Sequence, residues 1–379
     1  MIKRVEIKGL RGYKKNVIVI SFNKDINILT GINGIGKTTI LKLIWYTYSG
    51  NLSRATHEID FDSIEMITST KIIRIFRIDQ DKANEKEYNL EHHSGYDIYV
   101  EDTETKKVIL DTENELEPLF IGYCEDKVSE MNGNSLYFPT FRMIEGFSKQ
   151  RNNHSEFRFY QEESEEQILN KALKRISENI SRNGHKYITS VSTRDINELL
   201  TNKYAEISEV VNTNYKELSD EIETSISNNS ATNDSSHLYK QLNKIKDLLS
   251  DNKHQRENFF APINRINDIV EDIFLRKGIV IGNTLSFGEK KENIESELLS
   301  AGEKQMLGFI SYNAFYKKIP IIIDEPEISL HVDWQRRLLS VLDSQETNNQ
   351  IIVASHSPFI YSKYSDKEIY LDKENLVYE

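Results

Sequence analysis

The chain has a single cysteine, Cys124, among its 379 residues. One cysteine excludes a disulfide framework and any zinc site built from several thiolates, and it is typical of proteins from a reducing compartment. The sequence also lacks a run of about 20 consecutive apolar residues, which a membrane-spanning helix needs. The segment that begins at Met1 alternates apolar and polar residues, unlike the apolar stretch of a signal peptide. We therefore expect a cytoplasmic protein without a membrane partner.

Residues 185–261 contain neither glycine nor proline. The two strongest helix breakers are thus missing from 77 consecutive positions. Within this stretch apolar residues recur at steps of three and four from Ile196 to Ile226, behind Ser192 and an acidic Asp195 three residues on. This pattern predicts a long amphipathic helix that begins with a capping box.

A polar run at 227–236 interrupts the helical pattern, and a second apolar run starts near Leu238. The two runs predict an antiparallel helical hairpin, a coiled-coil arm with limbs of about 30 residues and about 45 Å each. We expect the chain to return to strands after Pro262.

Basic residues are outnumbered, because 48 Lys and Arg face 60 Asp and Glu for a net charge of −12. This balance excludes a uniformly basic nucleic-acid-binding protein. The first fifty residues nevertheless carry nine basic and two acidic side chains, a net +7, which leaves −19 for the other 329. An anionic ligand is therefore expected to lie against the amino-terminal segment.

The apolar patterns predict an α/β fold: a head of mixed sheet and helices, with an inserted antiparallel β region and a short helical arm. Short alternating runs predict a hairpin at 2–7 and 17–20 and further strands near 72–76, 96–100 and 108–110. The expected parts are an amino-terminal half of the head at 1–60, a β-rich part at 61–148, the arm at 149–280 and a carboxyl-terminal half of the head at 281–379.

A phosphate-binding pattern, Gly31-x4-Gly36-Lys37-Thr38, follows a short apolar run and precedes helical spacing. In such a loop the backbone N–H groups surround phosphate oxygens, the lysine reaches the β and γ phosphates, and the threonine hydroxyl binds Mg²⁺. A glycine-rich turn that matches by chance is the alternative, which the strand–loop–helix context disfavours. The residues expected to bind ATP here are Asn33, Gly34, Gly36, Lys37, Thr38 and Thr39.

An apolar run at 319–323 ends in Asp324 and Glu325. Acidic side chains at the carboxyl end of a buried strand lie where α/β sheets bind their ligands. We expect Asp324 to join Thr38 at Mg²⁺ and Glu325 to orient and deprotonate the attacking water. The alternative is a solvated turn.

Two further segments suit a nucleotide site. Ser300 and Glu303 have the spacing of a capping box, and a helix start that carries Ser300 and Gly302 can bind an anion. His356 follows a buried apolar run and is a candidate γ-phosphate sensor, although a lone histidine there is more often structural.

As a set, these motifs resemble the ABC-type ATPase head of the SMC, Rad50 and RecF group. The stretches 136–145 and 324–335 are similar to a bacterial family of AAA-type, OLD-like ATPases, whose members serve as ATPase subunits of two-component anti-phage systems of the Septu and PARIS kinds. The chain departs from the group's pattern in its Ser-Ala-Gly-Glu signature and in lacking a clear Q-loop glutamine, since Gln80 is equally suited to a turn.

The resemblance implies a homodimer in which two heads enclose two ATP molecules and Mg²⁺, with hydrolysis controlling head engagement. Ser300 and Gly302 of one copy would face the phosphates held by the other. Arg11 matches a position where relatives often carry a basic residue near the phosphates.

The predicted function is a slowly hydrolysing ATPase switch or scaffold in phage defence, which answers a phage-encoded trigger and holds or activates a separate effector, either a nuclease or a toxin. Higher assembly through the arms is left open. Only 23 residues follow His356, whereas a nuclease domain needs about 100, so no nuclease is expected in cis. The alternative is a RecF- or Rad50-like repair ATPase, with DNA as an optional second ligand of the basic amino-terminal surface.

Overall fold

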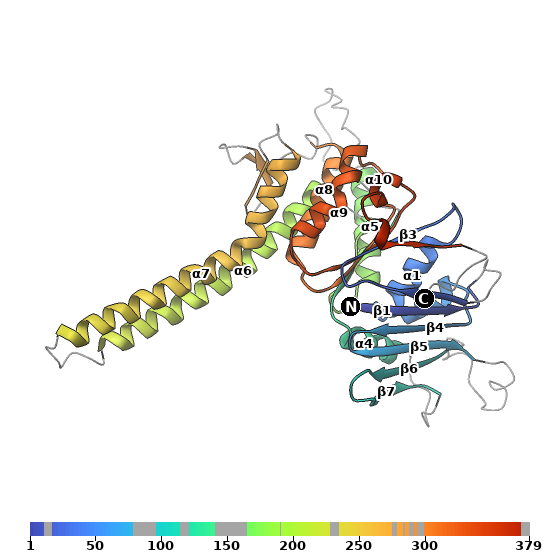
Figure 1. Cartoon of the computed structure of the whole chain (residues 1–379), viewed down its shortest axis with the longest axis horizontal. Helices are drawn as coiled ribbons and strands as arrows, with labels where there is room; N and C mark the ends of the chain where they lie inside the picture. The colour runs from blue at the N-terminus through green and yellow to red at the C-terminus, as the bar shows by residue number, and fades with distance from the viewer. Residues whose placement is uncertain are drawn as a thin grey trace, which may run out of the picture. The chain divides into compact units, whose positions relative to one another are not determined.

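In the computed structural model, the chain folds into two compact units (Figure 1). One comprises Met1–Val191, Ser300–Met306 and Tyr316–Glu379, and the other Ser192–Leu299 and Leu307–Phe315. The structure describes residues 1–10, 17–78, 96–113, 121–140, 165–189, 191–227, 235–274, 279–282, 285–287, 292–293 and 299–372.

A six-stranded parallel sheet of order β15-β3-β14-β13-β8-β9 lies at the centre of the first unit. Its strands are β3 (Ile26–Thr30), β8 (Ser135–Phe138), β9 (His185–Tyr187), β13 (Pro320–Asp324), β14 (Gln350–Ala354) and β15 (Glu368–Tyr370). Every residue of β3, β8, β13 and β14 is buried, as expected for strands covered on both faces. Because parallel strands end at one edge, the segments that follow these four strands are brought together there.

A six-stranded antiparallel sheet of order β2-β1-β4-β5-β6-β7 forms the rest of the β structure in this unit. Its strands are β1 (Ile2–Lys8), β2 (Val17–Ser21), β4 (Ser63–Thr68), β5 (Lys71–Arg77), β6 (Tyr96–Asp102) and β7 (Val108–Asp111). Burial alternates along β4, which is the pattern of a sheet with one packed and one solvated face. The predicted hairpin and the three predicted strands are confirmed, and so is the α/β class.

Helix α1 (Lys37–Ser49) directly follows the P-loop and buries ten of its 13 residues. It ends at Gly50, whose φ of 76° is in the left-handed region that suits a glycine C-cap. Trp45 on α1 donates a hydrogen bond from its indole Nε1 to Ser135 Oγ on β8 at 3.0 Å. Among the described residues, the unit also contains α2 (Leu52–Glu58), α4 (Ile121–Met131), α5 (Glu165–Ile180), α9 (Val332–Ser344), α10 (Pro358–Tyr361) and a 3-10 turn at Ser365–Lys367.

Strand β9 belongs to the parallel sheet, although it falls within the segment 149–280 that the sequence assigns to the arm. It has only three residues, so it offers no periodicity from which to predict it. Gly184 precedes it with a φ of 87°. The long arm helices begin later, at Thr193.

The second unit contains two long helices, α6 (Thr193–Ser227) and α7 (Ser235–Ile273), which pack against each other as the predicted antiparallel hairpin (Figure 1). At 1.5 Å per residue they are about 52 and 58 Å long, longer than predicted. The capping box that begins α6 is confirmed: Ser192 Oγ accepts from the Asp195 N–H at 3.1 Å, and Asp195 Oδ2 accepts from the Ser192 N–H at 3.0 Å.

Pro262 lies inside α7, so the expectation that the helical region ends there was wrong. An interior proline removes one helical hydrogen bond and costs about 3 kcal/mol. The helix continues because its last turns bury Ile263, Ile266 and Val270 at steps of three and four. Asn267 adds two hydrogen bonds to the backbone of Ile281, at 2.6 and 2.7 Å.

The remaining strands of this unit, β10 (Ile279–Ile281), β11 (Leu285–Phe287) and β12 (Glu292–Asn293), form a small antiparallel sheet. Helix α8 (Ala301–Phe315) contributes its first residues to one unit and its later residues to the other. None of the helices described is long and apolar enough to cross a bilayer.

Candidate functional site

The P-loop connects β3 to α1 at the carboxyl edge of the parallel sheet. Gly34 and Gly36 have φ values of 76° and 99°, a region that glycine enters without a Cβ clash. Gly31 (φ 137°) also needs to be glycine, because a Cβ would lie 2.6 Å from the Leu371 carbonyl oxygen. Successive N–H groups in such a loop, followed by a helix N-terminus, form a concave anion site.

Lys37 is buried, with 5% of its surface exposed. Its Nζ donates to the carbonyl oxygen of Gly31 at 3.0 Å and lies 3.3 Å from His356 Nδ1. Burial lowers the pKa of Lys37, whereas the nearby carboxylates of Glu325, Asp324 and Glu327 act in the opposite direction. The P-loop lysine and the predicted sensor histidine are therefore in contact.

Asp324 ends β13 and is fully buried. Its Oδ1 accepts a hydrogen bond from Thr38 Oγ1 at 3.2 Å, and its Oδ2 accepts one from Thr140 Oγ1. Hydroxyl and carboxylate oxygens are the hard donors that Mg²⁺ prefers, and protein sites for this ion usually use one or two carboxylates plus phosphates. The donor set of Thr38 and Asp324 thus fits the expected ion.

Glu325 is the residue after β13, and its φ of 48° is unusual for a residue with a side chain. Its backbone N–H donates to the Ala354 carbonyl oxygen at 2.9 Å, which fixes the turn to the end of β14. Glu325 Oε1 lies 3.9 Å from His356 Nε2. Burial, followed by Asp324 and Glu327, raises the pKa of Glu325, which suits a proton acceptor better than an ordinary surface carboxylate.

Two residues that the sequence motifs left without a role, Glu327 and Gln335, bind His356 and its neighbour Ser357. Glu327 Oε1 accepts a hydrogen bond from the His356 N–H at 2.7 Å. Gln335 on α9 accepts one from Ser357 Oγ at 2.6 Å and donates to the Leu330 carbonyl oxygen at 2.8 Å. The segment 324–335 therefore ties the end of β13 to the loop after β14.

Ser300 caps α8 as predicted: its Oγ accepts from the Glu303 N–H at 3.3 Å, and Glu303 Oε2 accepts from the Ser300 N–H at 2.7 Å. Gly302 packs against the segment after β13, where a Cβ would lie 2.4 Å from the Ser329 carbonyl oxygen. Ser300 and Gly302 contact α8 and this segment. A separate network joins Lys37, Thr38, Asp324, Glu325 and His356.

The other predicted residues are placed as follows. Asn33 and Gly34 are exposed in the P-loop, and Thr39 lies in the first turn of α1. Arg11 and Gln80 lie outside the described residues.

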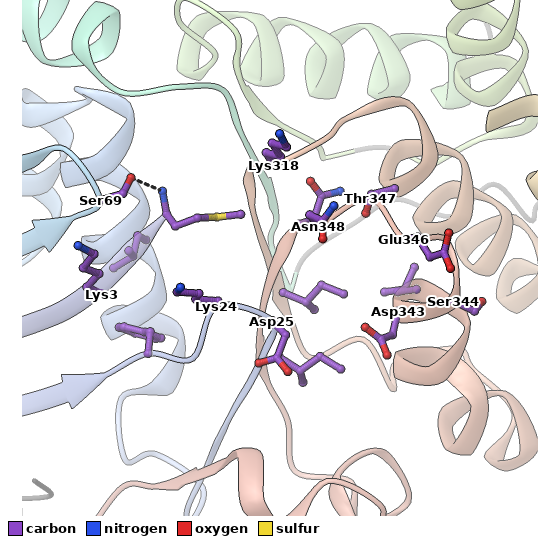
Figure 2. Close-up of a pocket in the computed structure, with 17 residues that line it drawn as sticks. Lys3, Lys24, Asp25, Ser69, Lys318, Asp343, Ser344, Glu346, Thr347 and Asn348 are labelled. Carbon is purple, nitrogen blue, oxygen red and sulfur yellow. Dashed lines mark hydrogen bonds between the residues drawn. The ribbon is translucent and has the colours of Figure 1, made fainter. Parts of the chain in front are cut away.

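A cavity of about 1050 Å³ lies at the opposite edge of the parallel sheet. It is lined by residues at the amino ends of β3, β13 and β14, among them Asp25, Lys318 and Asn349. Figure 2 shows Lys3 and Lys24 on one side of it, and Asp343 and Glu346 on the other. None of the predicted site residues that the structure describes lines this cavity, so it is separate from the P-loop network.

A family model described as an AAA ATPase domain matches residues 1–361. The Septu protein PtuA of Bacillus thuringiensis is 38% identical over 73 residues, which is 18% of this chain and 18% of that protein.

The chain is also similar to solved structures of SMC heads. The SMC head domain of Pyrococcus furiosus, solved with the C-terminal domain of ScpA, has a TM-score of 0.40 and 14% identity, and the alignment covers 95% of this chain and 91% of that chain. The SMC head domain of Thermotoga maritima has a TM-score of 0.38 and 10% identity over 96% and 91% of the two chains.

Proposed function

Because the chain belongs to the AAA ATPase domain family, we propose that it binds ATP at the carboxyl edge of the parallel sheet and hydrolyses it slowly, as a switch that controls a separate effector. The observation that carries the proposal is the single network that joins the P-loop, the end of β13 and His356. Phosphoryl transfer to water uses a phosphate-binding loop, a metal-binding carboxylate and a group that orients the water, and the network joins residues that suit these tasks.

In the bound state the N–H groups of the P-loop and the Lys37 ammonium hold the β and γ phosphates. Thr38 and Asp324 hold Mg²⁺, which when bound neutralises the charge that develops on the phosphate oxygens. Lys37 is preorganised for this task, because the loop carbonyl and His356 already fix its position.

Hydrolysis needs a group that orients water and accepts its proton. Glu325 takes that proton as the water oxygen attacks the γ phosphorus, and the products are ADP and phosphate. His356, in reach of both Lys37 and Glu325, responds to the presence of the γ phosphate.

We further propose that ATP joins two copies through their heads. Three large apolar side chains are exposed after the carboxyl ends of β3, β13 and β14: Ile32 (62%), Ile328 (41%) and Phe359 (36%). Apolar side chains gathered around a polar site favour a protein interface. The exposed Ser300 at the start of α8 would then face the phosphates held by the partner.

The ATP site is tested by nucleotide binding, measured with a fluorescent ATP analogue. We expect Lys37→Ala to weaken MgATP binding at least 10-fold, since a charge-assisted contact to phosphate contributes about 1.5–3 kcal/mol. Lys42→Ala, on the same helix, is the matched control and should bind like the natural chain. Equal affinities for the natural chain and Lys37→Ala would contradict the proposal.

The role in phage defence is supported by the stretch shared with the Septu protein PtuA. We propose that the effector is a separate nuclease or toxin and that a phage-encoded factor triggers the switch. Expression of this chain alone should then leave plaque counts unchanged, while co-expression with the neighbouring gene should lower them in a manner that depends on Glu325. Full protection by the chain alone would contradict the two-component arrangement.

A further inference from the structure

We propose that Thr140 is a positioning residue of the site, which holds the Asp324 carboxylate in the orientation needed to bind Mg²⁺. The inference rests on the proposed ATPase function and assigns a task to a residue that the sequence motifs leave without one. It follows from the contacts that Asp324 makes with two hydroxyl groups from different parts of the chain.

The topology brings Thr140 to Asp324. Strand β8 pairs in parallel with β13, and Phe138 lies opposite Ile323 in the register. Pro139, which follows β8, has a fixed φ and no N–H to extend the strand. Thr140 therefore leaves the sheet at the same edge as Asp324, one residue beyond the position that is level with it.

The two oxygens of Asp324 have different partners. Oδ1 accepts from Thr38 on α1, and Oδ2 accepts from Thr140 after β8. The carboxylate torsion of an aspartate is intrinsically broad, so a single hydrogen bond leaves the carboxylate free to rotate. Two hydroxyl donors on opposite oxygens fix its plane, and burial of Asp324 strengthens both contacts.

Loss of the Thr140 hydroxyl should weaken the binding of Mg²⁺ rather than the binding of the nucleotide. Thr38 is expected to bind Mg²⁺ directly, and Asp324 must then present its oxygen to the same ion. Groups that orient a metal ligand contribute about 10- to 100-fold to metal affinity. Thr140 acts through Asp324 and makes no contact with the P-loop lysine among the bonds described, so its loss should spare metal-free nucleotide binding.

The test uses the full chain with a non-hydrolysable ATP analogue, and the readout is the Mg²⁺ concentration that gives half of the analogue-induced rise in melting temperature. We expect Thr140→Val, which keeps the shape but lacks the hydroxyl, to raise this midpoint about 10-fold. Thr140→Ser retains the donor and should stay within about two-fold of the natural chain. Analogue binding in EDTA should be the same for all three.

An unchanged Mg²⁺ midpoint in Thr140→Val would overturn the assignment, and so would an equal defect in Thr140→Ser, because the hydroxyl would then be irrelevant. The melting temperature without nucleotide reports whether each variant folds. A natural chain with no Mg²⁺-dependent stabilisation by the analogue would overturn the proposed function itself, which separates the two failures.

Discussion

His185 occupies the middle of a buried hydrogen-bond chain that links β9 to three other elements. Its Nε2 lies 3.1 Å from the Ser129 carbonyl oxygen and its Nδ1 lies 2.8 Å from Ser135 Oγ. Since a carbonyl can only accept, Nε2 carries the proton of the neutral ring and Nδ1 accepts from Ser135. Ser135 in turn accepts from the Trp45 indole N–H. Every group in the chain is satisfied only while His185 is neutral.

The stability of the protein should therefore fall in mild acid. Burial lowers the pKa of His185 to about 4, below the value of about 6.5 in an unfolded chain. Between these values the unfolded chain binds a proton that the folded chain does not, so stability present above pH 6.5 is lost as the pH falls towards 4. The full effect of this group is about 3 kcal/mol.

Urea unfolding of the natural chain and of His185→Gln measures this effect. We expect the variant to have a lower free energy of unfolding than the natural chain at pH 7. This difference in free energy should be about 3 kcal/mol smaller at pH 4. His57→Gln removes an exposed histidine on α2. The free energy of unfolding of this control should change with pH as that of the natural chain does. If the difference in free energy of unfolding between the natural chain and His185→Gln stayed constant with pH, the His185 ring would not be held neutral.

At the scale of elements, the strands and helices that could be predicted are those with a strong local signal. Such a signal is present in the apolar runs within β13 and β14 and in the glycine-rich loop before α1. The cap of α6 does so as well, because its two partners are three residues apart. The carboxyl edge that carries Asp324, Glu325 and His356 was predictable for the same reason.

The elements that were missed depend on contacts distant in the sequence. Nothing near Thr140 indicates that its hydroxyl meets Asp324, 184 residues away. The contact between Glu327 and the His356 backbone also appears only when β13 and β14 lie side by side. Pro262 misled the prediction because the buried side chains that follow it outweigh the local cost of the proline.

At the scale of the whole molecule, the uneven charge of the sequence fits the proposed site. The net +7 of residues 1–50 includes Lys37, which lies near enough to the carboxylates of Glu325, Asp324 and Glu327 for them to raise its pKa. Addition of ATP and Mg²⁺ to such a site exchanges one set of charge pairs for another. In the proposed dimer, the exposed side chains of Ile32, Ile328 and Phe359 would form part of the surface on which the second copy packs.

The proposed ATP-dependent union of two heads is tested by the molar mass of Glu325→Gln in solution, measured by light scattering. This variant should retain ATP because it lacks the proton acceptor. We predict that MgATP doubles the molar mass of this variant. The additional change Ile328→Asp should abolish the doubling without loss of ATP binding. Val108→Asp, at an equally exposed apolar position on β7, should have no effect. The same molar mass with and without MgATP, under conditions in which the nucleotide is bound, would contradict the proposed union of two heads.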